Sequence, residues 1–321
     1  MSVQERYFKG SVPGLELTSF KLGGNVELWQ VSKFAELEEL LSYFKQKGTN
    51  WRIIGGGSNL VIDDSGISEP VIQFSRSSSF SVAGVEFSSS SIDNFLNKRF
   101  LDHRKNLSTF GAGETVEVFC GAACQLMTLS RESAAMGLSG LEFAAGIPAQ
   151  LGGAVRMNAG AHGSSISEVL SRAWVLDENL NLVERGLEDL GFSYRESGLR
   201  SEEVVVAVAL KFTAGDAKEI MKERKASLDY RKETQPLHLP SAGSVFKNPE
   251  GVSAGALLER NGLSGISDGE VCFSSMHCNW LVKNEAKAKA ESVFRLVELA
   301  KKKVFEREGI ELKSEVIFWK S

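Results

Sequence analysis

A glycine-rich turn is the first group of residues in the sequence that could do chemistry. It directly follows a predicted strand at 51–54, and its residues are Gly55, Gly56, Gly57, Ser58 and Asn59. Glycines at the end of a strand can adopt positive φ and present backbone N–H groups to an anion, and the two polar side chains add further donors. This arrangement suits a pyrophosphate, although a tight turn that only requires glycine explains it equally well.

A second glycine-rich segment, Gly137–Gly163, contains seven glycines interleaved with apolar side chains such as Phe143 and Val155. If the segment is extended, its small side chains let the backbone lie flat against a planar ring and hydrogen-bond the edge of that ring. The alternative is a buried strand that crosses close to another backbone.

A third candidate region joins Tyr230–Pro236 to Pro240–Pro249. Gly243 frees the backbone before Ser244, so that the serine hydroxyl can point into a cleft. Donors for a phosphate or a carboxylate are supplied by Arg231, Lys247 and Asn248. Taken alone, the region is explained more simply by a serine turn beside a solvated basic loop.

Two charged residues that are far apart in the sequence complete the set. Arg195 lies within Tyr194–Ser197, and Glu315 lies within Leu312–Val316 on a predicted strand. A carboxylate in such a place is usually an exposed strand residue. Hydrophobic periodicity alone therefore does not distinguish Glu315 from an ordinary surface residue.

The elements that would position these residues follow from hydrophobic periodicity and from helix start and stop signals. Strands are predicted at 26–31, 51–54, 116–121, 172–176, 203–212 and 311–318. A helix capped by Ser32 should end at Gly48, and further helices are predicted at 125–136, 214–226, 253–261 and along the C-terminal region up to Gly309. A polar loop is expected at 229–243.

The stretch 75–91 holds nine serines and predicts either a linker or exposed edge strands around a turn at Gly84. A short helix is expected to follow it at 92–100.

The composition excludes several classes of protein. With 321 residues, 42% hydrophobic, and a net charge of −4, the chain predicts a globular protein without the broad basic surface that grips nucleic acid. No run of about eighteen apolar residues is present, and the N-terminus is not apolar like a signal peptide, so a cytoplasmic protein is expected. The four cysteines and four scattered histidines lack metal-ligand spacing, so buried thiols are expected rather than a metal site.

Together these segments resemble the UDP-N-acetylenolpyruvoylglucosamine reductase (MurB) family, flavoenzymes of bacterial peptidoglycan precursor synthesis. The resemblance covers nearly the whole chain in family order. Its segments are Leu17–Gly24, Gly55–Asp63, Gly140–Gly163, Tyr194–Ser197, Ser241–Pro249, Ala254–Gly262, His277–Val282 and Gly309–Val316. The short stretch between Arg195 and Ser244 is similar to the second type of the family, which lacks an extra tyrosine-bearing loop.

The resemblance implies an α+β protein with a vanillyl-alcohol-oxidase/PCMH-like, two-part FAD-binding fold and a third, α+β substrate-binding domain. The expected FAD-binding parts are 1–75 and 76–212, and the expected substrate-binding domain is 213–308. The strand at 309–321 would return to the active site. FAD is expected to bind non-covalently, also beside His162, with NADPH as the electron donor.

The resemblance also assigns binding residues. The glycine-rich turn would cradle the FAD pyrophosphate, and part of 146–163 would line its rings. The cofactor residues are Gly55, Gly56, Gly57, Ser58, Asn59, Gly146, Ile147, Gly152, Gly153, Asn158, Gly160 and Ala161. A UDP-sugar substrate would be held by Tyr194, Arg231, Lys247 and Asn248.

The implied reaction reduces the enolpyruvyl group of UDP-N-acetylenolpyruvoylglucosamine to give UDP-N-acetylmuramate. Ser244 would donate the proton, while Arg195 and Glu315 would stabilise the intermediate. The last motif departs from the usual Leu-Glu-Pro-Glu-Val, because this chain has Leu312-Lys-Ser-Glu-Val316. Glu315 is assigned because it keeps the place before valine.

Two alternatives stay open: another flavin oxidoreductase of the same fold with a different substrate, and a non-catalytic nucleotide-binding protein. Neither a nucleic-acid partner nor a membrane partner is expected, and a monomer is favoured.

Overall fold

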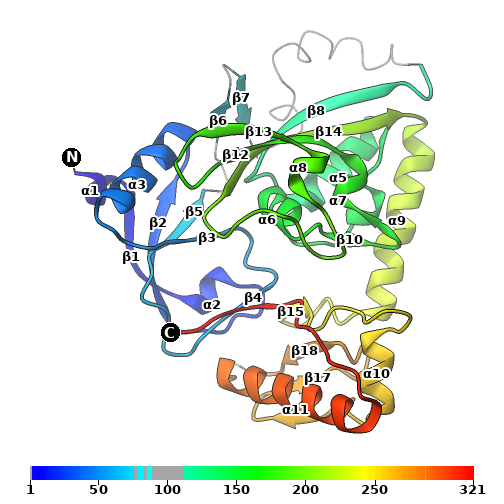
Figure 1. Ribbon diagram of the computed structural model, residues 1–321. Helices are drawn as coiled ribbons and strands as arrows, with labels where there is room; N and C mark the ends of the chain where they lie inside the picture. The colour runs from blue at the N-terminus through cyan, green and yellow to red at the C-terminus, as the bar shows by residue number, and fades with distance from the viewer. Residues whose placement is uncertain (1, 76–78, 83–84, 89–110, 286) are drawn as a thin grey trace. The chain divides into compact units, whose positions relative to one another are not determined.

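The computed structural model describes residues 2–75, 79–82, 85–88, 111–285 and 287–321 (Figure 1). The chain forms two compact units, each assembled from segments that are distant in the sequence. Unit 1 contains Met1–Phe8, Trp29–Gly55 and Val71–Asp229, and unit 2 contains Lys9–Leu28, Gly56–Pro70 and Tyr230–Ser321. The division into two FAD-binding parts and a substrate-binding domain concerns bound molecules and stays a prediction.

Unit 1 is built around an antiparallel sheet with the strand order β13–β12–β14–β8, and β9 (Leu138–Ser139) pairs with the end of β14. The strands are β8 (Thr115–Gly121), β12 (Leu170–Leu176), β13 (Leu182–Gly186) and β14 (Val204–Ala214). Residues 204–210 of β14 are buried at every position, as expected for an apolar strand covered on both faces. The strands predicted at 116–121, 172–176 and 203–212 are confirmed.

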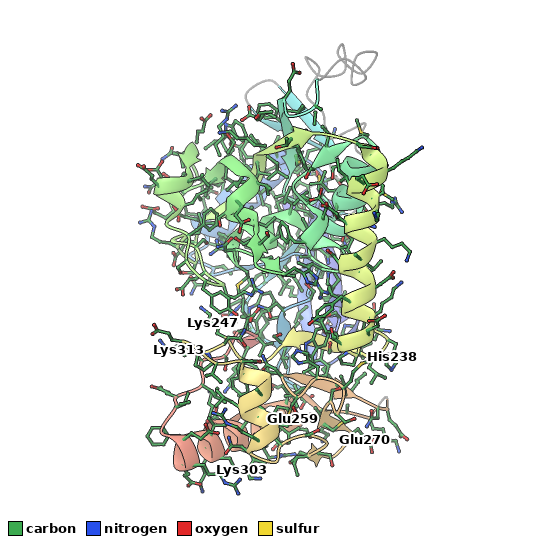
Figure 2. The ribbon with its side chains drawn as sticks, turned by 90° about the vertical axis from the view of Figure 1, so that its right-hand side faces the viewer. His238, Lys247, Glu259, Glu270, Lys303 and Lys313 are labelled. Atoms are coloured by element: carbon green, nitrogen blue, oxygen red, sulfur yellow. The ribbon has the colours of Figure 1, made fainter. Side chains whose placement is uncertain are left out.

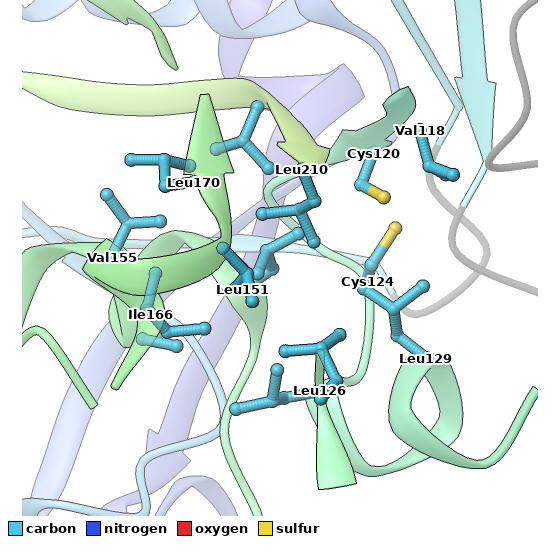
Figure 3. Packing of buried hydrophobic residues seen from close by; sticks show 14 of the residues in the cluster. Val118, Cys120, Cys124, Leu126, Leu129, Leu151, Val155, Ile166, Leu170 and Leu210 are labelled. Carbon is cyan, nitrogen blue, oxygen red and sulfur yellow. The ribbon is translucent and has the colours of Figure 1, made fainter. Parts of the chain in front are cut away.

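The largest apolar core of unit 1 joins this sheet to short helices. These are α5 (Leu126–Ala135), η3 (Glu142–Ala144), α6 (Leu151–Arg156) and α7 (Ile166–Val169). Cys120 and Cys124 lie in this core among leucines such as Leu126 and Leu210 (Figure 3). Burial raises the pKa of both thiols, so they act as small apolar groups.

Strands β1, β2, β5 and β3 form a second sheet in that order, and β3 runs parallel to β5. Their bounds are Phe8–Pro13, Asn25–Val31, Val71–Phe74 and Arg52–Ile54. Helix α3 (Phe34–Gln46) buries Leu37, Leu40, Leu41 and Phe44, so the predicted apolar stripe is confirmed. Ser32 does not cap this helix: Lys33 is the N-cap residue, and the Ser32 amide donates to the Glu36 carboxylate at 2.6 Å.

The serine-rich stretch contains β6 (Ser79–Val82) and β7 (Val85–Ser88), which pair antiparallel. The interpretation as strands is therefore confirmed for these residues. The short helix predicted at 92–100 lies outside the described residues.

Helix α9 (Ala217–Thr234) is longer than predicted, and the polar loop expected from 229 is wrong for its first six residues. The loop was predicted from the polarity of this segment, but charged residues such as those around 229 also occur in helices. An ion pair joins Lys225 to Asp229 at 2.5 Å, four residues apart along the helix. The first true helix breaker is Pro236, which lies two residues beyond the end of α9.

Unit 2 contains an antiparallel sheet with the order β15–β18–β17–β16. The strands are β15 (Ser241–Ser244), β16 (Ser267–Asp268), β17 (Val271–Phe273) and β18 (Trp280–Lys283). Helices α10 (Ala254–Arg260) and α11 (Ala290–Glu308) pack their apolar residues against the same core. Charged residues such as Glu259 and Lys313 are exposed on this unit (Figure 2). Both predicted helices are confirmed, and Gly309 ends α11 with φ of +69°.

The C-terminal strand is shorter than predicted. Only β19 (Ile317–Trp319) is a strand, and it runs parallel to β4 (Leu60–Ile62) within unit 2. The preceding residues make an isolated bridge, Phe246 with Ser314, and individual hydrogen bonds. A continuous ladder from 311 is therefore absent from this described segment.

The remaining short elements are α1 (Val3–Tyr7), α2 (Gly14–Leu17), α8 (Leu187–Leu190), β10 (Gly160–Ala161) and β11 (Ser164–Ser165). None of the helices in the described part of the chain combines the length and apolar character needed to cross a membrane.

Candidate active site

Gly55 is the last residue of a unit 1 segment of the chain, and Gly56–Asn59 belong to unit 2. Gly57 has φ of +60°, and a Cβ atom there would overlap the carbonyl oxygen of Leu17. Within the described ranges, the amides of Gly56, Gly57 and Ser58 donate to no other protein group. Three such N–H groups in a left-handed glycine turn fit an anionic group such as the pyrophosphate of FAD.

Asn59 connects this turn to the C-terminal segment. Its Nδ2 donates to the carbonyl of Glu315 at 2.9 Å, and its own carbonyl accepts the amide of Ile317 at 2.9 Å. The Asn59 side chain is thus already engaged in holding the backbone at Glu315. Its predicted contact with FAD stays a prediction.

Ser244 ends strand β15 directly after a β-bulge. Ser241 pairs with Val282 and Ser244 pairs with Trp280, so β15 contains one extra residue between these pairs. Gly243 supplies the positive φ, +78°, that this irregularity uses. A bulge changes the direction of the following side chain, which is how the glycine before Ser244 affects the hydroxyl.

Hydrogen bonds bring the segment after Ser244 to the segment of Glu315. The amide of Glu315 donates to the carbonyl of Val245 at 2.8 Å, and the amide of Lys247 donates to the carbonyl of Lys313 at 2.9 Å. Unit 2 therefore unites three of the predicted regions: the glycine-rich turn, the serine region and the C-terminal motif.

Arg195 belongs to unit 1 and sits in a tight turn. Ser193 and Glu196 bond to each other through both amides, at 3.1 and 3.3 Å, leaving Tyr194 and Arg195 as the central residues. Arg195 has φ of +58°, a conformation that usually selects glycine. Its Nη2 donates to the carbonyl of Gly160 at 2.6 Å, and its guanidinium lies 5.2 Å from the centre of the Tyr194 ring.

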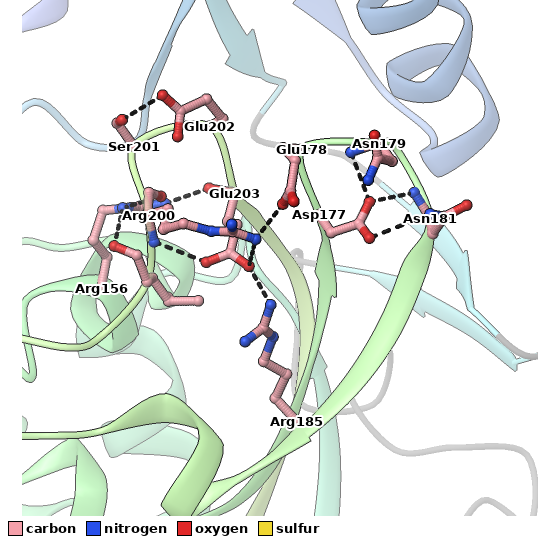
Figure 4. A network of polar contacts seen from close by, with 11 residues as sticks. Arg156, Asp177, Glu178, Asn179, Asn181, Arg185, Arg200, Ser201, Glu202 and Glu203 are labelled. Carbon is pink, nitrogen blue, oxygen red and sulfur yellow. Dashed lines mark hydrogen bonds and ion pairs between the residues drawn. The ribbon is translucent and has the colours of Figure 1, made fainter.

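The last residue of helix α6, Arg156, and a residue just after it, Asn158, hold the two sides of this loop. Asn158 donates from Nδ2 to the carbonyl of Ser193 at 2.9 Å, on the N-terminal side of Arg195. On the C-terminal side, the Arg156 guanidinium donates to backbone carbonyls of residues 199, 200 and 203 (Figure 4). The segment predicted to line the flavin therefore also carries the Arg195 loop.

The extended conformation expected for 137–163 is wrong for residues 142–144 and 151–156, which are helical, while the short strands β9 and β10 lie within the segment. Residues 151–156 form helix α6, in which Gly152 packs so closely on Ala122 that an added Cβ would lie 2.9 Å from the Ala122 Cβ. Glycine density thus reflects close helix packing as well as turns. Gly153 faces open space, and Gly146 has φ of +83°. The other cofactor candidates of this segment, Ile147 and Ala161, are partly buried.

The predicted substrate residues differ in environment. In unit 1, the Tyr194 ring is half exposed, beside Arg195. In unit 2, Arg231 is only 7% exposed and donates from Nε to Gln235 at 3.0 Å. Lys247 is partly buried, while Asn248 accepts the amide of Ala254 at 2.9 Å and so supports the start of α10.

Asn279 is a functional candidate to which the sequence assigned no role, although it lies within the resembling segment His277–Val282. It is 3% exposed and lies between Cys278 and Trp280, both buried. A buried polar side chain must be hydrogen-bonded, and Asn279 binds the backbone of Phe246 with both ends of its carboxamide. The available signal was a lone asparagine inside an apolar run.

Comparisons with known proteins agree on one family. The family model described as UDP-N-acetylenolpyruvoylglucosamine reductase, C-terminal domain, matches residues 235–319. A reductase of that name from Caldicellulosiruptor bescii is 39% identical over 312 residues, which cover 95% of this chain and 88% of the relative. The corresponding protein of Heliobacterium modesticaldum is 36% identical over 302 residues, covering 93% and 86%.

A solved structure extends this similarity to the fold. The crystal structure of UDP-N-acetylenolpyruvylglucosamine reductase (MurB) from Thermus caldophilus superposes with a TM-score of 0.75 at 30% identity, covering 98% of this chain and all of that chain. The predicted fold class is confirmed.

The strained backbone of Arg195 can be separated from its side chain by comparing Arg195→Ala with Arg195→Gly. Both variants lose the guanidinium, but only glycine adopts φ of +58° without penalty. We expect the glycine variant to be more stable toward urea by about 1 kcal/mol. Equal stabilities would show that the turn relaxes and that no strain is stored there.

The carboxylate of Glu203 should stabilise unit 1 through its buried contacts with Arg185 and Arg200. Its side chain is 1% exposed, pairs with Arg185 and accepts the amide of Arg200 at 2.8 Å (Figure 4). We expect Glu203→Ala to lower the free energy of unfolding by about 3–5 kcal/mol, because it leaves Arg185 without its buried partner. The control is Glu178→Ala, which removes an exposed pair with Arg200 and should cost at most about 1 kcal/mol. Similar losses in both variants would contradict the assignment.

Proposed function

Because the chain belongs to the UDP-N-acetylenolpyruvoylglucosamine reductase family, we propose that it reduces the enolpyruvyl group of UDP-N-acetylenolpyruvoylglucosamine to UDP-N-acetylmuramate, using FAD and NADPH. This reaction belongs to bacterial peptidoglycan precursor synthesis. The comparisons with known proteins confirm the resemblance of the sequence to this family. The observation that carries the site assignment is the convergence of the glycine-rich turn, Ser244 and Glu315 in unit 2.

The residues of this chain fit FAD. The N–H groups of Gly56, Gly57 and Ser58 would hold its pyrophosphate, and Gly55 would complete the turn. Residues of 146–161, among them Gly153 with its open surroundings, would line its rings. When bound, FAD supplies hydride transfer from NADPH to the substrate.

Ser244 would donate the proton that completes reduction. A serine hydroxyl is a weak acid, but the acceptor is a strongly basic substrate carbon, and a fixed position raises the rate of such a transfer. The bulge at Gly243 and the hydrogen bonds after Ser244 provide the fixed position. A simple serine turn was the alternative explanation for this region. The hydrogen bonds between the residues after Ser244 and the Glu315 segment favour a functional site instead.

Arg195 would stabilise negative charge that spreads into the substrate carboxylate, which is what a preorganised cation does best. The Gly160 carbonyl limits the movement of its guanidinium, and the left-handed backbone is the kind of strain that is retained at functional sites. Glu315 would either donate a hydrogen bond to the developing charge or orient another donor. Both roles require it to lie near Ser244.

Tyr194, Arg231, Lys247 and Asn248 would bind the UDP-sugar. The cationic and amide donors of the last three match diphosphate oxygens. We further propose a cytoplasmic monomer of the second family type, without nucleic-acid or membrane partners. A net charge of −4 supports the absence of nucleic acid.

The decisive experiment follows the two half-reactions of Ser244→Ala separately and without oxygen. NADPH should reduce the bound flavin at the wild-type rate, because Ser244 has no part in that step. Reoxidation of the flavin by UDP-N-acetylenolpyruvoylglucosamine should slow by about 10²–10⁴-fold, measured by stopped-flow absorbance.

Ser267→Ala is the matched control, since it removes an exposed serine hydroxyl from strand β16 of the same sheet and should leave both half-reactions intact. Loss of the NADPH step in Ser244→Ala, or a normal substrate step, would refute the role of Ser244. A wild-type flavin that the substrate cannot reoxidise would refute the proposed function itself.

A further inference from the structure

We propose that Asn279 is a positioning residue that holds Ser244 and Glu315 in register for proton transfer. The proposal rests on the function proposed above. Asn279 immediately precedes strand β18, whose first residue, Trp280, pairs with Ser244. It is 3% exposed, so its contacts with the protein are protected from competition by water.

The Asn279 carboxamide replaces a missing strand partner. The regular ladder of β15 ends at Ser244, so the next backbone groups need other partners. Asn279 donates from Nδ2 to the Phe246 carbonyl at 2.8 Å and accepts the Phe246 amide on Oδ1 at 3.0 Å. Its own carbonyl accepts the amide of Val245 at 2.8 Å. One residue thus fixes both residues that follow Ser244.

The opposite side of the same two residues is bound to the C-terminal segment. The Val245 carbonyl accepts the amide of Glu315 at 2.8 Å, and Phe246 forms a bridge with Ser314. Val245 and Phe246 therefore lie between Asn279 and Glu315. Any shift of this pair moves the backbone of Ser244 and that of Glu315 together.

Proton transfer is the step that such a shift should affect. Misplacement by about 1 Å costs up to about 10²-fold in rate, even when no reacting group is altered. An aspartate at 279 keeps the shape but loses the Nδ2 donor and places a charge against the Phe246 carbonyl. The NADPH half-reaction does not use Ser244 and should be spared.

The test measures both half-reactions of the FAD-loaded Asn279→Asp variant by anaerobic stopped-flow. We expect flavin reduction by NADPH to stay within about twofold of wild type, and reoxidation by UDP-N-acetylenolpyruvoylglucosamine to slow about 10–100-fold. Asn279→Ser, which keeps a smaller donor and acceptor, should give an intermediate rate. The serine variant also tests the proposal if the aspartate variant fails to fold.

Asn261→Asp is the matched control. Asn261 is another buried asparagine of unit 2, 2% exposed, and its Nδ2 donates to the Leu257 carbonyl at 2.8 Å. Because it makes no contact with the Ser244 segment among its described hydrogen bonds, its variant should lose stability but retain the substrate half-reaction.

A double variant separates positioning from a general structural role. If Asn279 acts through Ser244, adding Asn279→Asp to Ser244→Ala should slow reoxidation far less than it does in the wild-type background. Full additivity, equal substrate losses in the two asparagine variants, or loss of FAD from both Asn279 variants would overturn the proposal. A wild-type protein inactive toward the substrate would instead overturn the proposed function.

Discussion

The hydrogen bond from the Glu315 amide to the Val245 carbonyl is the constraint on which the candidate site of unit 2 depends. It joins segments separated by about seventy residues, and closing so long a loop costs entropy that a single hydrogen bond would not offset. The bond is one of a set: on the other side the Asn279 carbonyl accepts the Val245 amide, and Asn59 donates to the Glu315 carbonyl. The Asn59 side chain thus binds the Glu315 carbonyl, while the Asn279 side chain binds both backbone groups of Phe246.

In unit 1, the conformation of the Arg195 turn is likewise held by contacts from outside the turn, but different groups make them. The Arg195 turn is strained at its central residue, so its conformation must be enforced by what surrounds it. Asn158 and Gly160 hold its beginning and its guanidinium, while Arg156 holds the backbone beyond it. Arg156, Asn158 and Gly160, each two residues apart, therefore act on both sides of the Arg195 loop. This explains why this part of the chain combines glycine with polar side chains.

The sequence predicted local features better than the connections between them. The left-handed turns at Gly57 and Gly243, and the apolar stripe of α3, were predictable because each depends on a few neighbouring residues. Glu315 emerged only through family resemblance, since its relation to Val245 is non-local. Helix α6 was missed because glycine has poor helix propensity, and tertiary packing on Ala122 overrides that preference. Asn279 carries no periodic signal at all.

The buried thiols described above have a consequence for how the protein can be observed. Cys120 and Cys124 lie in the core of unit 1, and Cys278 is buried in unit 2, where burial raises the pKa of its thiol to about 12. Thiolate is the reactive form, so alkylating reagents react very slowly with these three cysteines while the units stay closed, whereas Cys272 is only partly buried. Labelling of these buried cysteines therefore reports the transient opening of the unit that contains them. The labelling rate of each one gives the local opening free energy without any engineered probe.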